Sequence, residues 1–169
     1  LMTAAFSEDF ANIATLPGSG WYTQNNSVPV GSTSWFQGNT TVFTSQSGNA
    51  DSYIGANFNA TTGVNTISEW LLTPTIGFNN GDVIRFWTRT VTGNQFPDRL
   101  QVRLSLNGSS TNVGTGSASV GDFTGLITDI NPTYTVGGYP EVWTQYTVTM
   151  SGLSGQTYGR LAFRYFVEN

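Results

Sequence analysis

All positively charged side chains of this chain are arginines, because it contains neither lysine nor histidine. The six arginines form three pairs whose members lie four positions apart: Arg85 and Arg89, Arg99 and Arg103, and Arg160 and Arg164. In an extended segment this spacing keeps both side chains of a pair on one side of the pleat. A guanidinium binds a carboxylate through two parallel hydrogen bonds and also stacks on rings, so such a face could receive an acidic or sugar-containing ligand.

The candidate ligand-binding residues lie on the strand faces that carry these arginines: Arg85, Trp87, Arg89, Gln101, Arg103 and Arg164, with Phe166 beside them. The alternative is a solvated outer face, on which the arginines cover aromatic rings and pair with Glu69, Asp98 or Glu141 of other strands. The pattern favours this alternative, because the outer face of a strand must be polar in any case. The pattern also does not establish that the three segments are neighbours, so the charges need not form one patch.

The ten acidic residues suggest two further kinds of chemistry. Glycoside hydrolysis needs two carboxylates about 5 to 9 Å apart, but the adjacent pair Glu8 and Asp9 points to opposite sides of a predicted strand. Calcium binding needs carboxylate, amide and carbonyl oxygens rather than histidine or cysteine. The acids nearest to predicted strand ends in the first third of the chain are Glu8, Asp9 and Asp51, and the simpler interpretation of these three is surface charge.

The composition excludes several classes of function. Without cysteine and histidine the chain lacks the usual zinc and copper ligands, the thiol nucleophile and the serine–histidine dyad. A formal net charge of -4 gives no basic footprint for nucleic acid. No apolar run approaches the roughly 20 residues that a membrane-spanning helix needs, so this segment is not expected to insert into a membrane. We therefore expect a protein that is not an enzyme.

The elements that must position these residues are almost all strands. Apolar and polar residues alternate wherever a pattern is visible, and no long stretch repeats apolar positions at helical spacing. Strands are predicted at residues 4–10, 34–36, 52–58, 66–72, 82–91, 99–106, 123–130, 143–150 and 158–167. This number of strands, separated by Gly-, Asn- and Pro-containing turns, predicts one all-β domain over residues 1–169, either a β-sandwich of two antiparallel sheets or a jelly roll. Residues 109–120 are rich in Gly, Ser and Thr and are predicted to form a mobile loop.

Three of the predicted strands show the alternation clearly. The side chains expected in the core are Ile84, Phe86, Leu100, Val102, Leu104, Leu161, Phe163, Tyr165 and Val167. All six arginines then fall on the opposite faces of these strands.

Several longer motifs, taken in order, resemble the choice-of-anchor J proteins. They lie at residues 6–10, 20–21, 51–58, 68–74, 86–90, 96–103, 120–123, 139–143 and 160–165. No single motif is diagnostic, but their order and spacing span essentially the whole chain.

The resemblance implies a jelly-roll β-sandwich related to the cleaved adhesin domains of gingipains and, more distantly, to MAM domains. It also implies export from a bacterial cell, a place outside the cell or on its surface, and a sorting anchor, often of the PEP-CTERM type. Relatives in the adhesin group hold structural calcium with acids of the first strand and of the segment that matches residues 51–58. On this analogy Glu8, Asp9 and Asp51 become the calcium candidates.

The family usually continues after Asn169 with a Gly-rich turn and a last strand. A sheet without that strand has an open edge, and open edges pair with other chains, which predicts an oligomer formed by strand addition. The function we expect is an extracellular binding or adhesion module with cell-surface or matrix glycans as ligands. Two alternatives remain: a purely structural envelope or biofilm matrix protein, and a glycoside hydrolase or lyase that uses carboxylates.

Overall fold

The computed structural model describes residues 6–168, which form three short 3-10 helices and eleven strands. The helices are η1 Ile13–Thr15, η2 Pro17–Ser19 and η3 Phe58–Ala60. The strands are β1 Tyr22–Asn25, β2 Val28–Val30, β3 Phe36–Gln37, β4 Ile54–Gly55, β5 Thr61–Leu72, β6 Ile76–Phe78, β7 Val83–Thr88, β8 Leu100–Ser105, β9 Gly125–Ile130, β10 Thr144–Thr149 and β11 Thr157–Val167. None of the helices in this part of the chain is long and apolar enough to cross a membrane.

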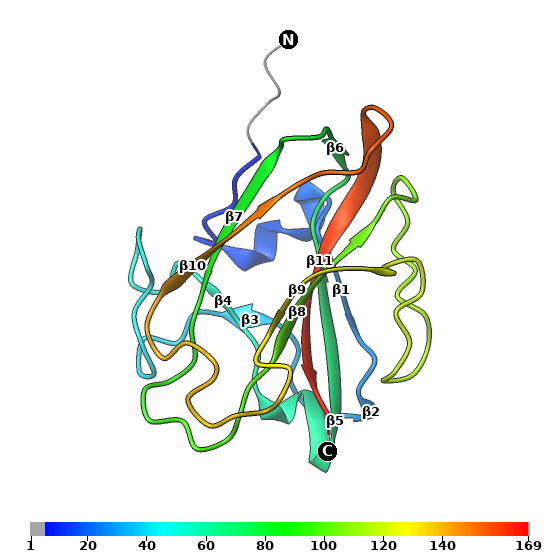
Figure 1. The fold of residues 1–169 in the computed structure, drawn as a ribbon. Helices are drawn as coiled ribbons and strands as arrows, with labels where there is room; N and C mark the ends of the chain where they lie inside the picture. Colours follow the sequence, from blue (N-terminus) through cyan, green and yellow to red (C-terminus); the bar gives the residue numbers. More distant parts are fainter. Residues whose placement is uncertain (1–5, 169) are drawn as a thin grey trace.

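The strands form one large antiparallel sheet and two small ones. The large sheet has the order β1-β5-β11-β8-β9, with β2 paired to β5 and β6 paired to β11. Strands β7 and β10 form a separate two-stranded sheet beside the large one, and β3 pairs with β4 (Figure 1). The prediction of an all-β sandwich of antiparallel sheets is confirmed. The jelly-roll connectivity stays a prediction.

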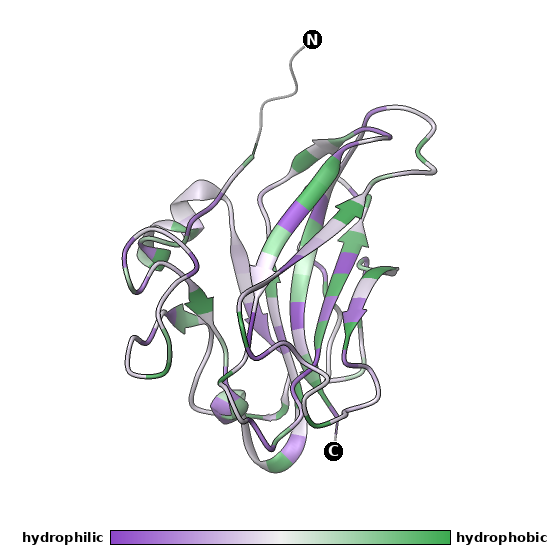
Figure 2. Ribbon diagram, turned by 60° about the vertical axis from the view of Figure 1, so that its left-hand side comes forward, coloured by the Kyte–Doolittle hydropathy of each residue, from purple (hydrophilic) through white to green (hydrophobic). Residues whose placement is uncertain are grey.

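The core between the two main sheets follows from strand alternation. Its buried side chains are Phe78, Val102, Met150 and Leu161, with Ile76, Ile84, Phe86, Leu104 and Phe163 packed against them. The Phe86 ring on β7 meets the Phe163 ring on β11 edge-on, with 5.2 Å between ring centroids. Figure 2 shows the alternation as hydrophobic and hydrophilic residues taking turns along the strands. The inward positions expected within 84–86, 100–104 and 161–163 are confirmed.

The opposite face of the large sheet is also buried, whereas the sequence pattern favoured a solvated surface. Trp70 and Leu72 on β5 and Ala162 on β11 pack there against Val113 and Phe123. Val113 and Phe123 belong to the connection between β8 and β9, so this connection lies over the sheet. Residues 109–120 form a loop, as predicted, but the loop is packed on the sheet rather than free in solvent, because apolar side chains on the second face of β5 need cover from water.

The beginning of the described chain is not a strand. The strand predicted at residues 4–10 is wrong for residues 6–10, and residues 1–5 lie outside the described residues. Oε1 of Glu8 accepts a hydrogen bond from the backbone N–H of Phe10 at 2.9 Å, and Oδ1 of Asp9 accepts one from Ala11 at 3.0 Å. Such local bonds compete with strand pairing, and Phe10 has a positive φ of 54°.

Candidate functional site

The structure divides the predicted ligand-binding residues between two surfaces on opposite sides of the sandwich. Arg85 and Trp87 lie on β7 with their side chains turned away from the core, because Ile84 and Phe86 fill it. Gln101 on β8 and Arg164 on β11 point to the second face of the large sheet. The idea that all of them share one ligand-facing surface is therefore wrong, since the two small-sheet residues and the large-sheet residues face away from each other.

Arg164 is a structural residue rather than a presented one. Its side chain is 1% exposed, and its guanidinium lies between the rings of Phe166 and Trp70, at 3.6 and 4.8 Å from the ring centroids. Nε donates to the Ser68 hydroxyl at 3.0 Å, and Nη2 donates to the backbone carbonyl of Ser117. Burial, and to a smaller extent the charges of Arg103 and Arg99, lower the pKa of Arg164 to about 9. The guanidinium thus ties the β8–β9 connection to the sheet.

Gln101 joins this buried arginine to Arg103. Its Oε1 accepts from Nη1 of Arg164 at 3.1 Å and from Nε of Arg103 at 2.8 Å, while its Nε2 donates to Asp129 at 3.2 Å. Arg103 also donates to the backbone carbonyl of Phe123 at 3.2 Å. Gln101 is 2% exposed, so a ligand in solution does not reach it. The predicted pairing of an arginine with Asp98 is not formed among the described residues: Arg99 pairs instead with Asp129 at 2.7 Å and with Glu168 at 3.0 Å.

Arg89 directly follows β7 and holds two loops together. Its Nη2 donates to the backbone carbonyl of Glu141 at 2.5 Å, and its guanidinium stacks over Phe43 at 4.5 Å from the ring centroid. Phe43 also stacks on Tyr53 and meets Trp143 edge-on, with centroids 5.0 and 5.7 Å away. The ion pair predicted between an arginine and the Glu141 carboxylate is therefore not formed among the described residues, because Arg89 binds the backbone oxygen of Glu141 and the carboxylate accepts from the N–H of Gly93.

Arg85 and Trp87 remain as presented side chains on the outer face of the β7–β10 sheet. Trp87 is 43% exposed and lies directly opposite Gln145 of β10, and Arg85 lies opposite Thr147. Arg85 is exposed, and it is the one arginine of the six with no hydrogen bond, ion pair or ring contact to the described residues. The four side chains form a flat polar and aromatic surface, which we call the β7–β10 face. Alternation places Gln145 and Thr147 on one side of their strand, but only the register brings them beside Arg85 and Trp87.

A large cleft, which the sequence did not predict, opens between the two main sheets. Its volume is about 1250 Å³. Phe86 of β7 lines one side, Trp35 and Phe36 line another, and its floor includes Ile67 of β5 and Val167 of β11. Most of its lining side chains are apolar or aromatic. The cleft exists because the two-stranded sheet covers only part of the inner face of the larger one.

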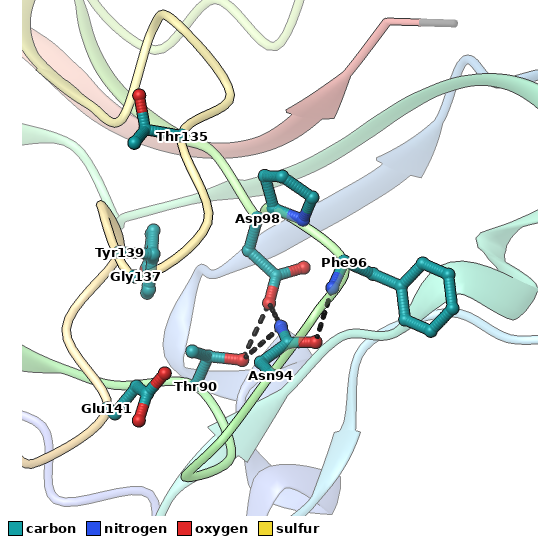
Figure 3. A pocket seen from close by; sticks show the side chains of 9 residues that line it. Thr90, Asn94, Phe96, Asp98, Thr135, Gly137, Tyr139 and Glu141 are labelled. Atoms are coloured by element: carbon teal, nitrogen blue, oxygen red, sulfur yellow. Dashed lines mark hydrogen bonds between the residues drawn. The ribbon is translucent and has the colours of Figure 1, made fainter.

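A second hollow holds two carboxylates but has little room. It lies between the loop that follows β7 and the loop that precedes β10, and Asp98 and Glu141 both line it (Figure 3). Oδ2 of Asp98 accepts from the Thr90 hydroxyl at 2.6 Å and from Asn94 at 2.8 Å. The cavity volume is about 10 Å³, which is space for about one water molecule and not for a sugar ring. The hollow therefore does not support hydrolysis of a glycoside between these two carboxylates.

The three predicted calcium ligands come from segments that meet. Nε2 of Gln37 donates to the backbone carbonyls of both Phe10 and Asp51, at 2.8 and 2.6 Å, so the segment of Glu8 and Asp9 lies beside that of Asp51. Over residues 6–168, however, no three acidic side chains gather closely enough to hold a metal ion. The carbonyls that converge already accept from an amide. The oxygen atoms of these described residues do not by themselves form a calcium site, and calcium binding stays a prediction.

Glu69 is a titratable group whose burial the sequence did not reveal. It lies on the inner face of β5, is 0% exposed, and neither carboxylate oxygen makes a hydrogen bond with good geometry. Burial raises the pKa of Glu69 to about 7, although the Ser34 hydroxyl and the backbone of Trp35 lower it in part. The predicted pairing of this residue with an arginine does not occur, because the arginines of the neighbouring strand point to the other face.

The comparisons with known proteins agree with this fold. No family model matches the chain, and a comparison with curated proteins found no match. The K1 cleaved adhesin domain of Lys-gingipain from Porphyromonas gingivalis W83 is 22% identical, with a TM-score of 0.55 over 88% of this chain and 81% of that domain. The K2 cleaved adhesin domain of Lys-gingipain is 16% identical, with a TM-score of 0.58 over 96% of this chain and 90% of that domain. The chain is therefore similar in fold to cleaved adhesin domains, as the resemblance implied.

Proposed function

We propose that this domain is an extracellular adhesion module, exported to a bacterial surface, which binds glycans without chemical turnover. The observation that carries the proposal is the β7–β10 face, where the half-exposed Trp87 lies beside the unpaired guanidinium of Arg85. The similarity in fold to cleaved adhesin domains supports an adhesive role and a place at the cell surface.

The chemistry of the β7–β10 face suits a sugar chain. The indole of Trp87 offers a flat apolar surface for the C–H face of a sugar ring, and its edge stays in water. The free guanidinium of Arg85 can receive the carboxylate of an acidic sugar through two parallel hydrogen bonds. Gln145 and Thr147 supply further donors and acceptors opposite them. A flat face of this kind accepts a stretch of polymer rather than a single enclosed sugar.

Retention on immobilised acidic polysaccharides tests the proposal. Trp87→Ala and Arg85→Gln should each weaken binding by about tenfold, since a stacked ring or a bidentate guanidinium contributes about 1–3 kcal/mol when it is desolvated. Tyr158→Ala is the matched control, because Tyr158 is a 58% exposed aromatic residue on β11 of the other sheet.

Equal retention of all three variants and the unchanged domain would refute the β7–β10 face as the glycan site. If no polysaccharide is retained while the domain still supports cell attachment or matrix assembly, the purely structural alternative is favoured instead.

A further inference from the structure

Within residues 6–168, strand β7 has one edge without a pairing partner. Just beyond its two ends, the carbonyl of Asp82 accepts from Met150 at 2.8 Å and the N–H of Thr90 donates to the carbonyl of Pro140 at 2.7 Å, both residues of the segment that contains β10. Because backbone direction alternates along an antiparallel strand, the even-numbered residues bond to β10 and Val83, Arg85 and Trp87 turn their N–H and C=O groups away from it. Across residues 6–168 no strand pairs with that edge.

The large cleft lies next to this edge. The second half of β7 lines it, and Phe10, Trp35 and Ile54 line it on other sides. Its floor is the inner face of the large sheet, where Leu71 and Phe163 lie. An extended segment placed here would use its backbone to satisfy the unpaired groups of β7, and its inward side chains would cover the apolar floor.

The positive charge of Arg85 on this edge favours one kind of incoming strand over another. Edge-to-edge pairing of two copies about a twofold axis near the middle of β7 would bring two Arg85 side chains together, and like charges facing each other destabilise a sheet. An acidic residue on the incoming strand, directly opposite Arg85, would instead have its Cβ atom about 5 Å from that of Arg85, so its carboxylate could reach the guanidinium. The occupant that the edge fits is therefore acidic on its outer face and apolar on its inner face.

We propose that the free edge of β7 and the adjoining cleft bind an extended segment of another polypeptide, in which acidic and apolar residues alternate, by antiparallel strand addition. The acidic residue opposite Arg85 exchanges two backbone hydrogen bonds with it, because the backbone N–H and C=O of Arg85 point to this edge. The apolar residues of the same segment face the large sheet, and their N–H groups point away from β7.

Backbone methylation of a probe peptide tests the proposal without changing the domain. The probe is a blocked octapeptide of alternating valine and glutamate, measured by isothermal titration. N-methylation of its glutamates removes the donors that face β7 and should weaken binding by about tenfold or more, since each lost hydrogen bond costs about 1 kcal/mol. N-methylation of its valines is the matched control and should leave the affinity nearly unchanged.

A charge exchange tests the role of Arg85. The peptide of alternating valine and lysine should bind the unchanged domain weakly, and Arg85→Glu should reverse the preference between the two peptides. Equal affinities of the two methylated probes, or absence of saturable binding, would overturn the proposal. Self-association of the domain that blocks the peptide would also overturn it, because it would assign the edge to a second copy. The methylation comparison involves only the backbone of β7, so its outcome is separate from that of Trp87→Ala in glycan binding.

Discussion

Replacement of Glu69 by glutamine should change how stability depends on pH. In the folded domain the pKa of Glu69 rises from 4.5 to about 7, because the carboxylate is buried without a good partner. The folded state then holds its proton more tightly than the unfolded state, so stability falls as pH rises from about 4.5 to about 7 and stays low above that. Each pKa unit of this rise corresponds to about 1.4 kcal/mol, so the folded domain loses about 3 kcal/mol of stability.

Glu69→Gln removes the ionisation and keeps the shape of the side chain. We expect the variant and the unchanged domain to have similar free energies of unfolding near pH 5, and the variant to be more stable by about 3 kcal/mol near pH 8. Urea unfolding followed by tryptophan fluorescence measures both, and the chain has five tryptophans. Few other side chains titrate in this interval, because the chain has no histidine or cysteine.

The matched control is Asp9→Asn, measured like the other variants in calcium-free buffer, which removes an exposed carboxylate whose one hydrogen bond the amide oxygen can replace. This control should follow the pH curve of the unchanged domain within about 0.5 kcal/mol. If Glu69→Gln also runs parallel to the unchanged domain from pH 5 to pH 8, Glu69 is not held in a site that disfavours its charge, and the reasoning fails.

Two further predictions concern the second face of the large sheet and calcium. Arg164→Met should lower the free energy of unfolding by about 2–4 kcal/mol, because Ser68, Gln101 and the Ser117 carbonyl lose their buried donor; equal stability in urea unfolding would contradict the structural role. A chelator should lower the melting temperature if calcium binds only the folded state, and Asp51→Asn should abolish that response. An unchanged melting temperature with chelator present would argue against calcium.

The inner core was predictable because it depends on a local rule. Ile84, Phe86 and Phe163 occupy alternate positions in strongly alternating segments, and side chains of a strand point to opposite faces in turn. Any pairing that buries one side chain of such a set buries the rest. The class of fold and the inward residues of three strands therefore followed from the chain alone.

The second buried face was not predicted, although one signal was present. In β5, Trp70 and Leu72 are apolar on one side and Leu71 is apolar on the other, and a strand that is apolar on both sides is covered on both sides. The arginines on the same strand faces pointed to the opposite interpretation, because a charged guanidinium usually indicates a face exposed to solvent. Arg164 is instead accommodated by a ring on each side and by acceptors from three segments.

The sequence by itself determined an antiparallel β protein, its alternating core positions and the likeness to adhesin domains. Only the tertiary structure decided which arginine stays free, because a period of two sorts side chains into faces and does not say what covers each face. It likewise decided the register that sets Trp87 beside Gln145, the burial of Glu69, and the cleft along the unpaired edge of β7. Each of these features depends on contacts between segments far apart in the chain. The free energies of such contacts cannot be inferred from a local sequence pattern.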